Sequence, residues 1–180
     1  MPPVTGGGKS GASRADVDLD MKTVLFLCTG NYYRSRFAEE IFNFAAPLDC
    51  PGWLAISRGI AVDLGVNNVG PIARPAAQAL QKRGLTFNPL LARMPLQLEI
   101  ADLEAAHHIV ALKKAEHLSL MQERFPAWPG TTDPSRMEYW HVDDTDRMAP
   151  EQALPLIAEQ LQGLMKRLCG RTLAIAGKPK

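Results

Sequence analysis

The sequence has little cysteine, with only three such residues in 180. Cys28, Cys50 and Cys169 form no CxxC pair and no Cys/His spacing typical of zinc, and an odd, sparse set is not a disulfide framework. We therefore expect no metal site and no fold held by disulfides. Free thiols of this kind indicate a reducing, cytoplasmic compartment, in which Cys50 and Cys169 would be incidental.

Long apolar runs and basic runs are also absent. No stretch approaches the roughly 18 apolar residues that span a membrane, and the N-terminus lacks the apolar core of a secretory signal. The net charge is +1, and Lys and Arg form no stripe. We expect neither a membrane nor a nucleic acid as a partner, whereas the composition is compatible with a local site for one anion.

Residues 1–20 are rich in Gly, Pro, Ser and Asp, a composition typical of a disordered tail. The GGGKS within them is not a nucleotide-binding loop, because Pro3 stands where that motif requires its first glycine. We predict one domain over residues 21–170 and a C-terminal tail over 171–180. A chain of 180 residues with 46% hydrophobic content suits a single core.

Strand and helix signals alternate through the predicted domain. Short continuous apolar runs favour buried parallel strands, and apolar residues spaced three or four apart favour helices. The predicted strands are 23–27, 53–58, 108–112 and 138–142. The predicted helices are 36–46, 75–84, 114–125 and 151–169, with a short helix or turn within 98–106. This alternation predicts an α/β fold, a four-stranded parallel sheet with helices on both faces.

The segment CTGNYYRS, residues 28–35, follows the first predicted strand and is a candidate phosphate-binding loop. Curled backbone N–H groups form a nest for an oxyanion, and the next helix adds its positive dipole end. Gly30 permits a close approach of backbone, and Asn31 tolerates left-handed geometry. The predicted phosphate-binding residues are Thr29, Gly30, Asn31, Tyr32, Tyr33, Arg34 and Ser35.

Cys28 begins this loop and is the candidate nucleophile. The loop amides, the helix dipole and the guanidinium of Arg34 all favour its thiolate form. Arg34 can bind two phosphate oxygens through its planar fork, and Ser35 could donate a hydrogen bond to the sulfur. The pattern CxGNxxRS, placed between an apolar strand and an amphipathic helix, therefore predicts attack by Cys28 on phosphorus.

At these residues the chain resembles the low-molecular-weight protein tyrosine phosphatases and the related thioredoxin-linked arsenate reductases. The resemblance covers roughly residues 22–168, from VLFLCTGNYYRS at the first strand and loop to EYWHVDD at the last strand and acid loop. It implies phosphomonoester hydrolysis through a phosphocysteine, with no metal and no cofactor. The expected substrate is a phosphotyrosine protein or a small aryl phosphate, with inorganic phosphate as product and inhibitor.

Four aspartates compete for the role of general acid that the resemblance implies. Asp133 precedes Pro134, as the family's acid precedes a proline, but it lies before the last predicted strand. In the pattern Glu-x-Trp-x-x-Asp-Asp the second aspartate, Asp144, takes the acid position, ahead of Asp143 and Asp146. The predicted catalytic residues are Cys28, Arg34 and Asp144.

Departures from the family pattern leave alternatives open. Tyr33 stands where the family often has a second, protective cysteine, and residues 85–105 contain none of the cysteines that an arsenate reductase needs. The loop-supporting histidine of the family is replaced in the segment before Arg93. Tyr32 or Tyr33 could line the pocket by stacking or pack against the core. The two alternative functions are a phosphate- or anion-binding regulatory module without turnover and an arsenate reductase.

Overall fold

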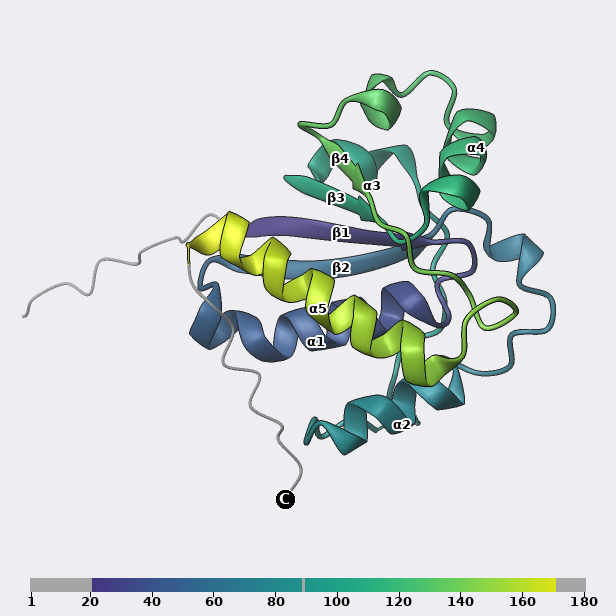
Figure 1. The fold of residues 1–180 in the computed structure, drawn as a ribbon. Coiled ribbons are helices and arrows are strands. Elements are labelled where there is room, and N and C mark those ends of the chain that lie inside the picture. Colours follow the sequence, from purple (N-terminus) through teal and green to yellow (C-terminus); the bar gives the residue numbers. More distant parts are fainter. Residues whose placement is uncertain (1–20, 89, 171–180) are drawn as a thin grey trace, which may run out of the picture.

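The described residues form one four-stranded sheet in which all neighbouring strands run parallel. A computed structural model describes residues 21–88 and 90–170, and the predicted tails lie outside them. The strand order is β2-β1-β3-β4 (Figure 1). The strands are β1 Lys22–Cys28, β2 Trp53–Gly59, β3 His108–Ala111 and β4 Met137–Tyr139. The predicted α/β class and parallel sheet are confirmed.

Helices cover both faces of this sheet. Figure 1 shows α1, α2 and α5 on one face and α3 and α4 on the other. The helices are α1 Arg34–Asp49, α2 Arg74–Lys82, α3 Ile100–Ala105, α4 Lys114–Arg124 and α5 Pro150–Cys169, with the 3-10 turns η1 Val62–Leu64 and η2 Pro129–Thr132. None of the helices in the described ranges is long and apolar enough to cross a membrane.

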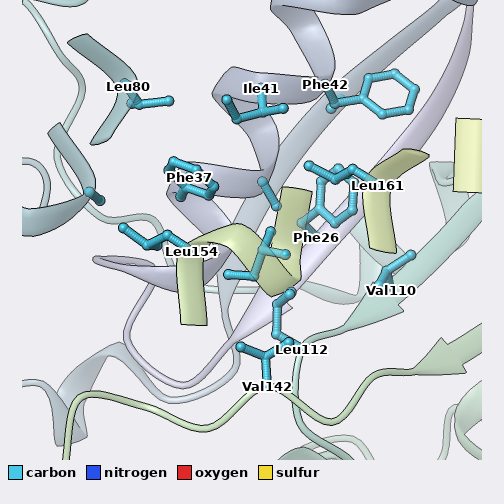
Figure 2. Packing of buried hydrophobic residues seen from close by; sticks show 14 of the residues in the cluster. Phe26, Phe37, Ile41, Phe42, Leu80, Val110, Leu112, Val142, Leu154 and Leu161 are labelled. Carbon is cyan, nitrogen blue, oxygen red and sulfur yellow. The ribbon is translucent and has the colours of Figure 1, made fainter. Parts of the chain in front are cut away.

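Strand β1 is buried on both of its faces. Val24 and Phe26 belong to the larger core cluster, between the sheet and α1, α2 and α5, and Figure 2 shows Phe26 beside Leu161 of α5. Leu25 and Leu27 point the other way, into the cluster under α3 and α4. Burial of each such side chain stabilises the fold by about 1.5–3 kcal/mol, so the loop after β1 has a rigid base.

Most predicted element boundaries are wrong by one to three residues, and two of these differences are informative. The last strand ends at Tyr139; beyond it the N–H of Val142 still donates to the carbonyl of Leu112 (2.9 Å), but without regular strand pairing. The first helix begins at Arg34 instead of Arg36. The apolar stripe marks only the part of this helix that faces the core, whereas its first turn is made by the polar residues of the loop itself.

The prediction that Cys50 and Cys169 are incidental thiols is also wrong. They form a disulfide with Cα atoms 5.3 Å apart and a sequence separation of 119 residues. Cys50 directly follows α1, Cys169 ends α5, and these two helices pack against each other. The pairing depends on that packing of distant segments, so cysteine count and spacing could not reveal it.

We expect Cys169→Ala to lower the free energy of unfolding by about 2–4 kcal/mol, because a cross-link over a long loop restricts the unfolded chain. Urea denaturation without reducing agent measures the difference. A reducing agent should bring the wild type down to the stability of the variant and leave the variant unchanged. A wild-type midpoint that does not respond to reduction would contradict the expected stabilisation.

Candidate active site

The candidate loop connects the carboxyl end of β1 to the start of α1, since Cys28 is the last residue of the strand and Arg34 the first of the helix. Ligands of parallel α/β sheets bind at this edge. Asn31 has a φ of 49°, the left-handed conformation that asparagine tolerates. A Cβ on Gly59, at the end of β2, would lie 2.8 Å from the carbonyl oxygen of Thr29. Strand β2 can therefore approach the loop this closely only with glycine at that position.

Cys28 is buried and is the free cysteine of the chain, with 3% of its surface exposed. Its Sγ lies 2.9 Å from the Oγ of Ser35, and either atom could be the donor. The predicted contact between these two side chains is therefore present. A serine hydroxyl that donates to a thiolate stabilises its charge, which suits the sulfur as attacking group and later as leaving group.

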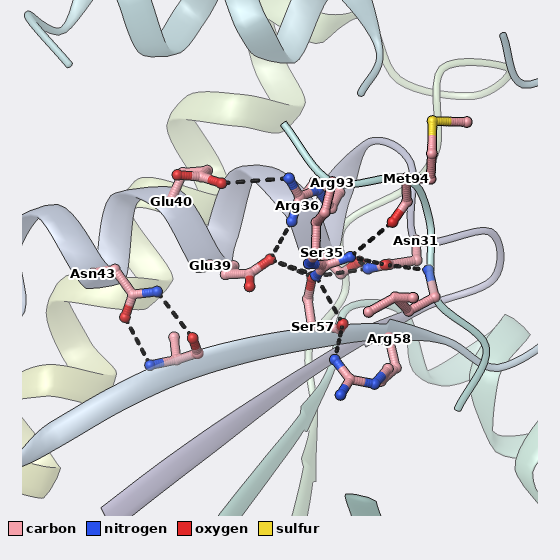
Figure 3. A network of polar contacts seen from close by, with 12 residues as sticks. Asn31, Ser35, Arg36, Glu39, Glu40, Asn43, Ser57, Arg58, Arg93 and Met94 are labelled. Atoms are coloured by element: carbon pink, nitrogen blue, oxygen red, sulfur yellow. Dashed lines mark hydrogen bonds and ion pairs between the residues drawn. The ribbon is translucent and has the colours of Figure 1, made fainter. Parts of the chain in front are cut away.

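A network of side chains supports the loop from below (Figure 3). The amide nitrogen of Asn31 donates to the Oγ atoms of Ser35 (3.0 Å) and Ser57 (2.8 Å). Arg93 donates from Nη1 to Asn31 Oδ1 (2.9 Å) and from Nη2 to Glu39 Oε2 (2.8 Å). The sequence predicted neither Arg93 nor Glu39 as a site residue. The replacement of the family's loop-supporting histidine in the segment before Arg93 was the one sign in the sequence that another residue there could support the loop.

Arg34 is fully buried and faces two carboxylates. Its Nη1 lies 3.0 Å from Glu116 Oε2, and its Nη2 lies 2.7 Å from Asp144 Oδ2. Burial alone would lower the pKa of Arg34, but the hydrogen bond to Glu116 and the charges of Cys28, Asp144 and Glu116 raise it above its ordinary value. Arg34 is thus a permanent cation at the start of α1. Glu116 was missed, although it follows β3, whose carboxyl end neighbours that of β1.

The aspartates predicted as possible acids lie at different distances from the loop. Asp144 contacts Arg34, whereas Asp143 forms an ion pair with Lys113 (2.7 Å between Oδ2 and Nζ). Asp133 accepts hydrogen bonds from Ser135 in the turn before β4. Of these three, Asp144 is the one in direct contact with the candidate loop.

Both loop tyrosines pack rather than stack in the pocket. Tyr33 is 5% exposed within the larger core cluster, and burial raises the pKa of its hydroxyl well above the ordinary value. The hydroxyl of Tyr32 donates to the carbonyl of Val69 (2.7 Å), and its ring lies against the same cluster. The choice that the sequence left open is therefore settled in favour of the core, and neither tyrosine lines the cavity beside the loop.

A cavity of about 860 Å³ opens beside the loop. Its lining includes more acidic than basic side chains and no aromatic residue, and its largest apolar side chain is the half-exposed Leu64. The lining residues are Thr29, Gly30, Leu64, Gly65, Asn67, Asn68, Lys113, Ala115, Glu116, Asp143, Asp144, Thr145, Asp146 and Arg147. Among the described residues, no group of three or more His, Cys, Asp or Glu side chains could hold a metal ion.

Comparison with known proteins gives a consistent set of relatives. Residues 23–171 match the family model described as low molecular weight phosphotyrosine protein phosphatase. The low molecular weight protein-tyrosine-phosphatase YfkJ of Bacillus subtilis is 30% identical over 163 residues, which are 89% of this chain and 99% of that protein.

Solved structures show the same fold. The crystal structure of YfkJ from Bacillus subtilis has a TM-score of 0.67 at 24% identity and covers 82% of this chain and 94% of its own. The phosphatase SP-PTP from Streptococcus pyogenes has a TM-score of 0.66 at 20% identity, over 82% of this chain and 93% of its own. The four-stranded parallel sheet with helices on both faces is thus shared across the length of these proteins.

Proposed function

The chain belongs to the low molecular weight phosphotyrosine protein phosphatase family, and from this membership we propose which of its residues carry the reaction. It is a cysteine-dependent, metal-independent phosphatase that hydrolyses phosphomonoesters, and the arsenate reductase and non-enzymatic alternatives are not favoured. The proposed roles are Cys28 as nucleophile, Arg34 and the loop amides as phosphate ligands, and Asp144 as general acid and base. The close contact of Cys28 with Ser35, beside a buried Arg34, carries this proposal.

In the first step, the thiolate of Cys28 attacks phosphorus opposite the leaving oxygen. An S–P bond forms while the P–O bond to the leaving group breaks, and Asp144 gives its proton to the departing oxygen. Arg34 and the backbone N–H groups of 29–35 bind the equatorial phosphate oxygens, where charge gathers in the transition state. The products are a phosphocysteine and the free alcohol or phenol.

In the second step, water attacks the phosphocysteine and Asp144, now ionised, accepts a proton from that water. An O–P bond forms, the S–P bond breaks, and Cys28 leaves as a thiolate that Ser35 stabilises by a hydrogen bond. Inorganic phosphate is the product, and the same groups that bind the transferred phosphoryl group would bind it as an inhibitor. No redox reagent or cofactor is required.

Phosphoproteins and aryl phosphates are the substrates implied by the family. We propose that the ring of phosphotyrosine lies against Leu64, which lines the cavity and is 56% exposed. A cytoplasmic location remains part of the proposal, because Cys28 must stay reduced to act. There the Cys50–Cys169 disulfide would have to resist reduction by the thiols of that compartment.

The assignment of the acid is tested by hydrolysis of p-nitrophenyl phosphate in the presence of EDTA. We expect Asp144→Asn to lower kcat by about 10²–10⁴-fold, the range of general acid–base catalysis, and Asp143→Asn to lower it by less than about threefold. Asp143→Asn is the matched control because it removes an adjacent carboxylate that contacts Lys113 instead of Arg34. A larger loss in Asp143→Asn would assign the acid to that residue, and loss of wild-type turnover in EDTA would contradict the metal-independent reaction.

A further inference from the structure

The hydrogen-bond donors of Arg34 are almost all occupied by protein acceptors. Nη1 donates to Glu116 Oε2 (3.0 Å) and to the carbonyl of Val142 (3.1 Å). Nη2 donates to Glu116 Oε1 (3.0 Å) and to Asp144 Oδ2 (2.7 Å). The remaining donor, Nε–H, is buried and has no partner among the described residues. An incoming phosphate can therefore take Nε directly, but to be bound by Nη2 as well it must displace one of the two carboxylates.

The two carboxylates lie on different sides of the guanidinium. Glu116 takes the end of the group, with one oxygen on each Nη, the paired geometry that arginine and carboxylate prefer. Asp144 takes the second hydrogen of Nη2, on the edge that Nη2 shares with Nε. This Nε–Nη2 edge offers two parallel donors to phosphate as soon as Asp144 leaves. Displacement of Glu116 would not free the same edge.

Glu116 is held by more contacts than its pair with Arg34. It lies in the first turn of the 11-residue helix α4, where the helix dipole favours an anion. Its Oε1 also accepts a hydrogen bond from the hydroxyl of Thr29 in the loop. Burial alone would raise the pKa of Glu116, but contacts with His117 and Arg34 outweigh this and hold it far below its ordinary value.

The side chain of His117 lies next to Glu116. The imidazole is fully buried, and its Nδ1 accepts the backbone N–H of Lys113 (3.0 Å), so in the neutral ring the proton is on Nε2. Nε2 lies 3.4 Å from Glu116 Oε1 and makes no hydrogen bond within the residues described. Asp144 has less support in the described part of the chain: besides Arg34, its side chain accepts there only the N–H of Thr145 (2.8 Å) in an exposed loop.

From these contacts we propose that Glu116 is a positioning residue that stays on Arg34 throughout the reaction, and that phosphate replaces Asp144 on the Nε–Nη2 edge. The exchange rests on the proposed phosphate site at residues 28–35. It couples two events, because the phosphate that displaces Asp144 also frees the carboxyl group that must reach the leaving oxygen. Glu116 meanwhile fixes the plane of the guanidinium.

Binding of inorganic phosphate, measured by calorimetry, distinguishes the two carboxylates. We expect Asp144→Asn to tighten phosphate binding about three- to tenfold, because it removes the competitor, although it lowers kcat. Glu116→Ala should weaken phosphate binding about tenfold or more and lower kcat, and Glu116→Gln, which keeps one acceptor, should recover part of the loss. Asp146→Asn is the control for charge alone: it removes an exposed carboxylate from the same cavity without contact to Arg34.

Tighter binding in Glu116→Ala, with no gain in Asp144→Asn, would overturn the proposal, because phosphate would then replace Glu116. An equal gain in Asp146→Asn and Asp144→Asn would also overturn it, since only the net charge of the cavity would matter. If Glu116→Ala does not fold, the proposal is tested by comparing the phosphate affinities of Asp144→Asn and Asp146→Asn. If the wild type hydrolyses an aryl phosphate but Asp144→Asn does not bind inorganic phosphate more tightly than the wild type, the exchange is contradicted. The proposed function is not affected by that result.

Discussion

Cys28→Ser is expected to reduce hydrolysis of p-nitrophenyl phosphate by at least about 10⁴-fold. A serine hydroxyl has a far higher pKa than a thiol, so at neutral pH it supplies no anion to attack phosphorus. Within residues 21–88 and 90–170, the side chain hydrogen-bonded to residue 28 is that of Ser35, which is not a base. Loss of a nucleophile that acts with other catalytic groups removes most of the rate enhancement. The measurement is steady-state turnover, with and without EDTA.

Phosphate binding is the control for this variant. The binding groups are the loop amides and Arg34, so Cys28→Ser should still bind inorganic phosphate within about tenfold of the wild type. Wild-type protein mixed rapidly with substrate should accumulate a phosphocysteine, detectable as an added phosphoryl mass, and the variant should not. Cys169→Ala offers a cysteine substitution outside the site, one that removes the disulfide and should leave turnover unchanged where the variant is folded. Turnover retained in Cys28→Ser would contradict the proposed mechanism.

Arg34→Lys should lower kcat/KM by about 10³-fold. Lysine keeps the positive charge but is a point donor, and it cannot bind two phosphate oxygens in parallel or remain paired with Glu116 through two nitrogens. Removal of one preorganised donor to a developing oxyanion typically costs about 10²–10³-fold, and this substitution loses more than one. We expect kcat to fall more than KM rises, because the lost contacts are strongest in the transition state.

Arg36→Lys is the matched control, because Arg36 is a buried arginine in the same helix turn that pairs with Glu39 and Glu40 instead of facing the cavity. It should lower stability more than it lowers kcat/KM. Urea denaturation and turnover on both variants separate the two effects. Similar losses of kcat/KM in Arg34→Lys and Arg36→Lys would mean that folding of α1, rather than phosphate binding, explains the result.

The local part of the site could be predicted from the sequence. The loop at 28–35 is contiguous, so the order of a buried strand, a glycine-containing turn and a helix places its residues together without knowledge of the rest of the fold. Asp144 was selected by its position in the pattern Glu-x-Trp-x-x-Asp-Asp, which resembles the acid loop of the family, and the structure places it against Arg34. Its role as acid stays a prediction.

The parts of the site that come from distant segments could not be predicted. Glu116 reaches the loop because β3, which precedes its helix, lies beside β1. Arg93 reaches it because the segment after α2 runs next to the end of β2, where Gln97 pairs with Gly59. Neither Glu116 nor Arg93 belongs to a motif that the sequence alone displays. The orientation of Tyr33 is a similar case: from the sequence its ring could line the pocket or pack against the core, and the cluster that buries it is built from distant segments.

The Cys50–Cys169 disulfide determines which parts of the chain stay covalently connected after a proteolytic cut. Between the two cysteines the backbone forms a closed ring that contains β2, β3, β4 and all of α5, while β1, the loop and α1 extend from it as an attached arm. A protease cut at one point within the ring opens it but separates nothing, so Cys28 and Asp144 remain parts of one molecule. After reduction, a cut between Cys50 and Asp144 would leave Cys28 and Asp144 on two fragments held together only by packing.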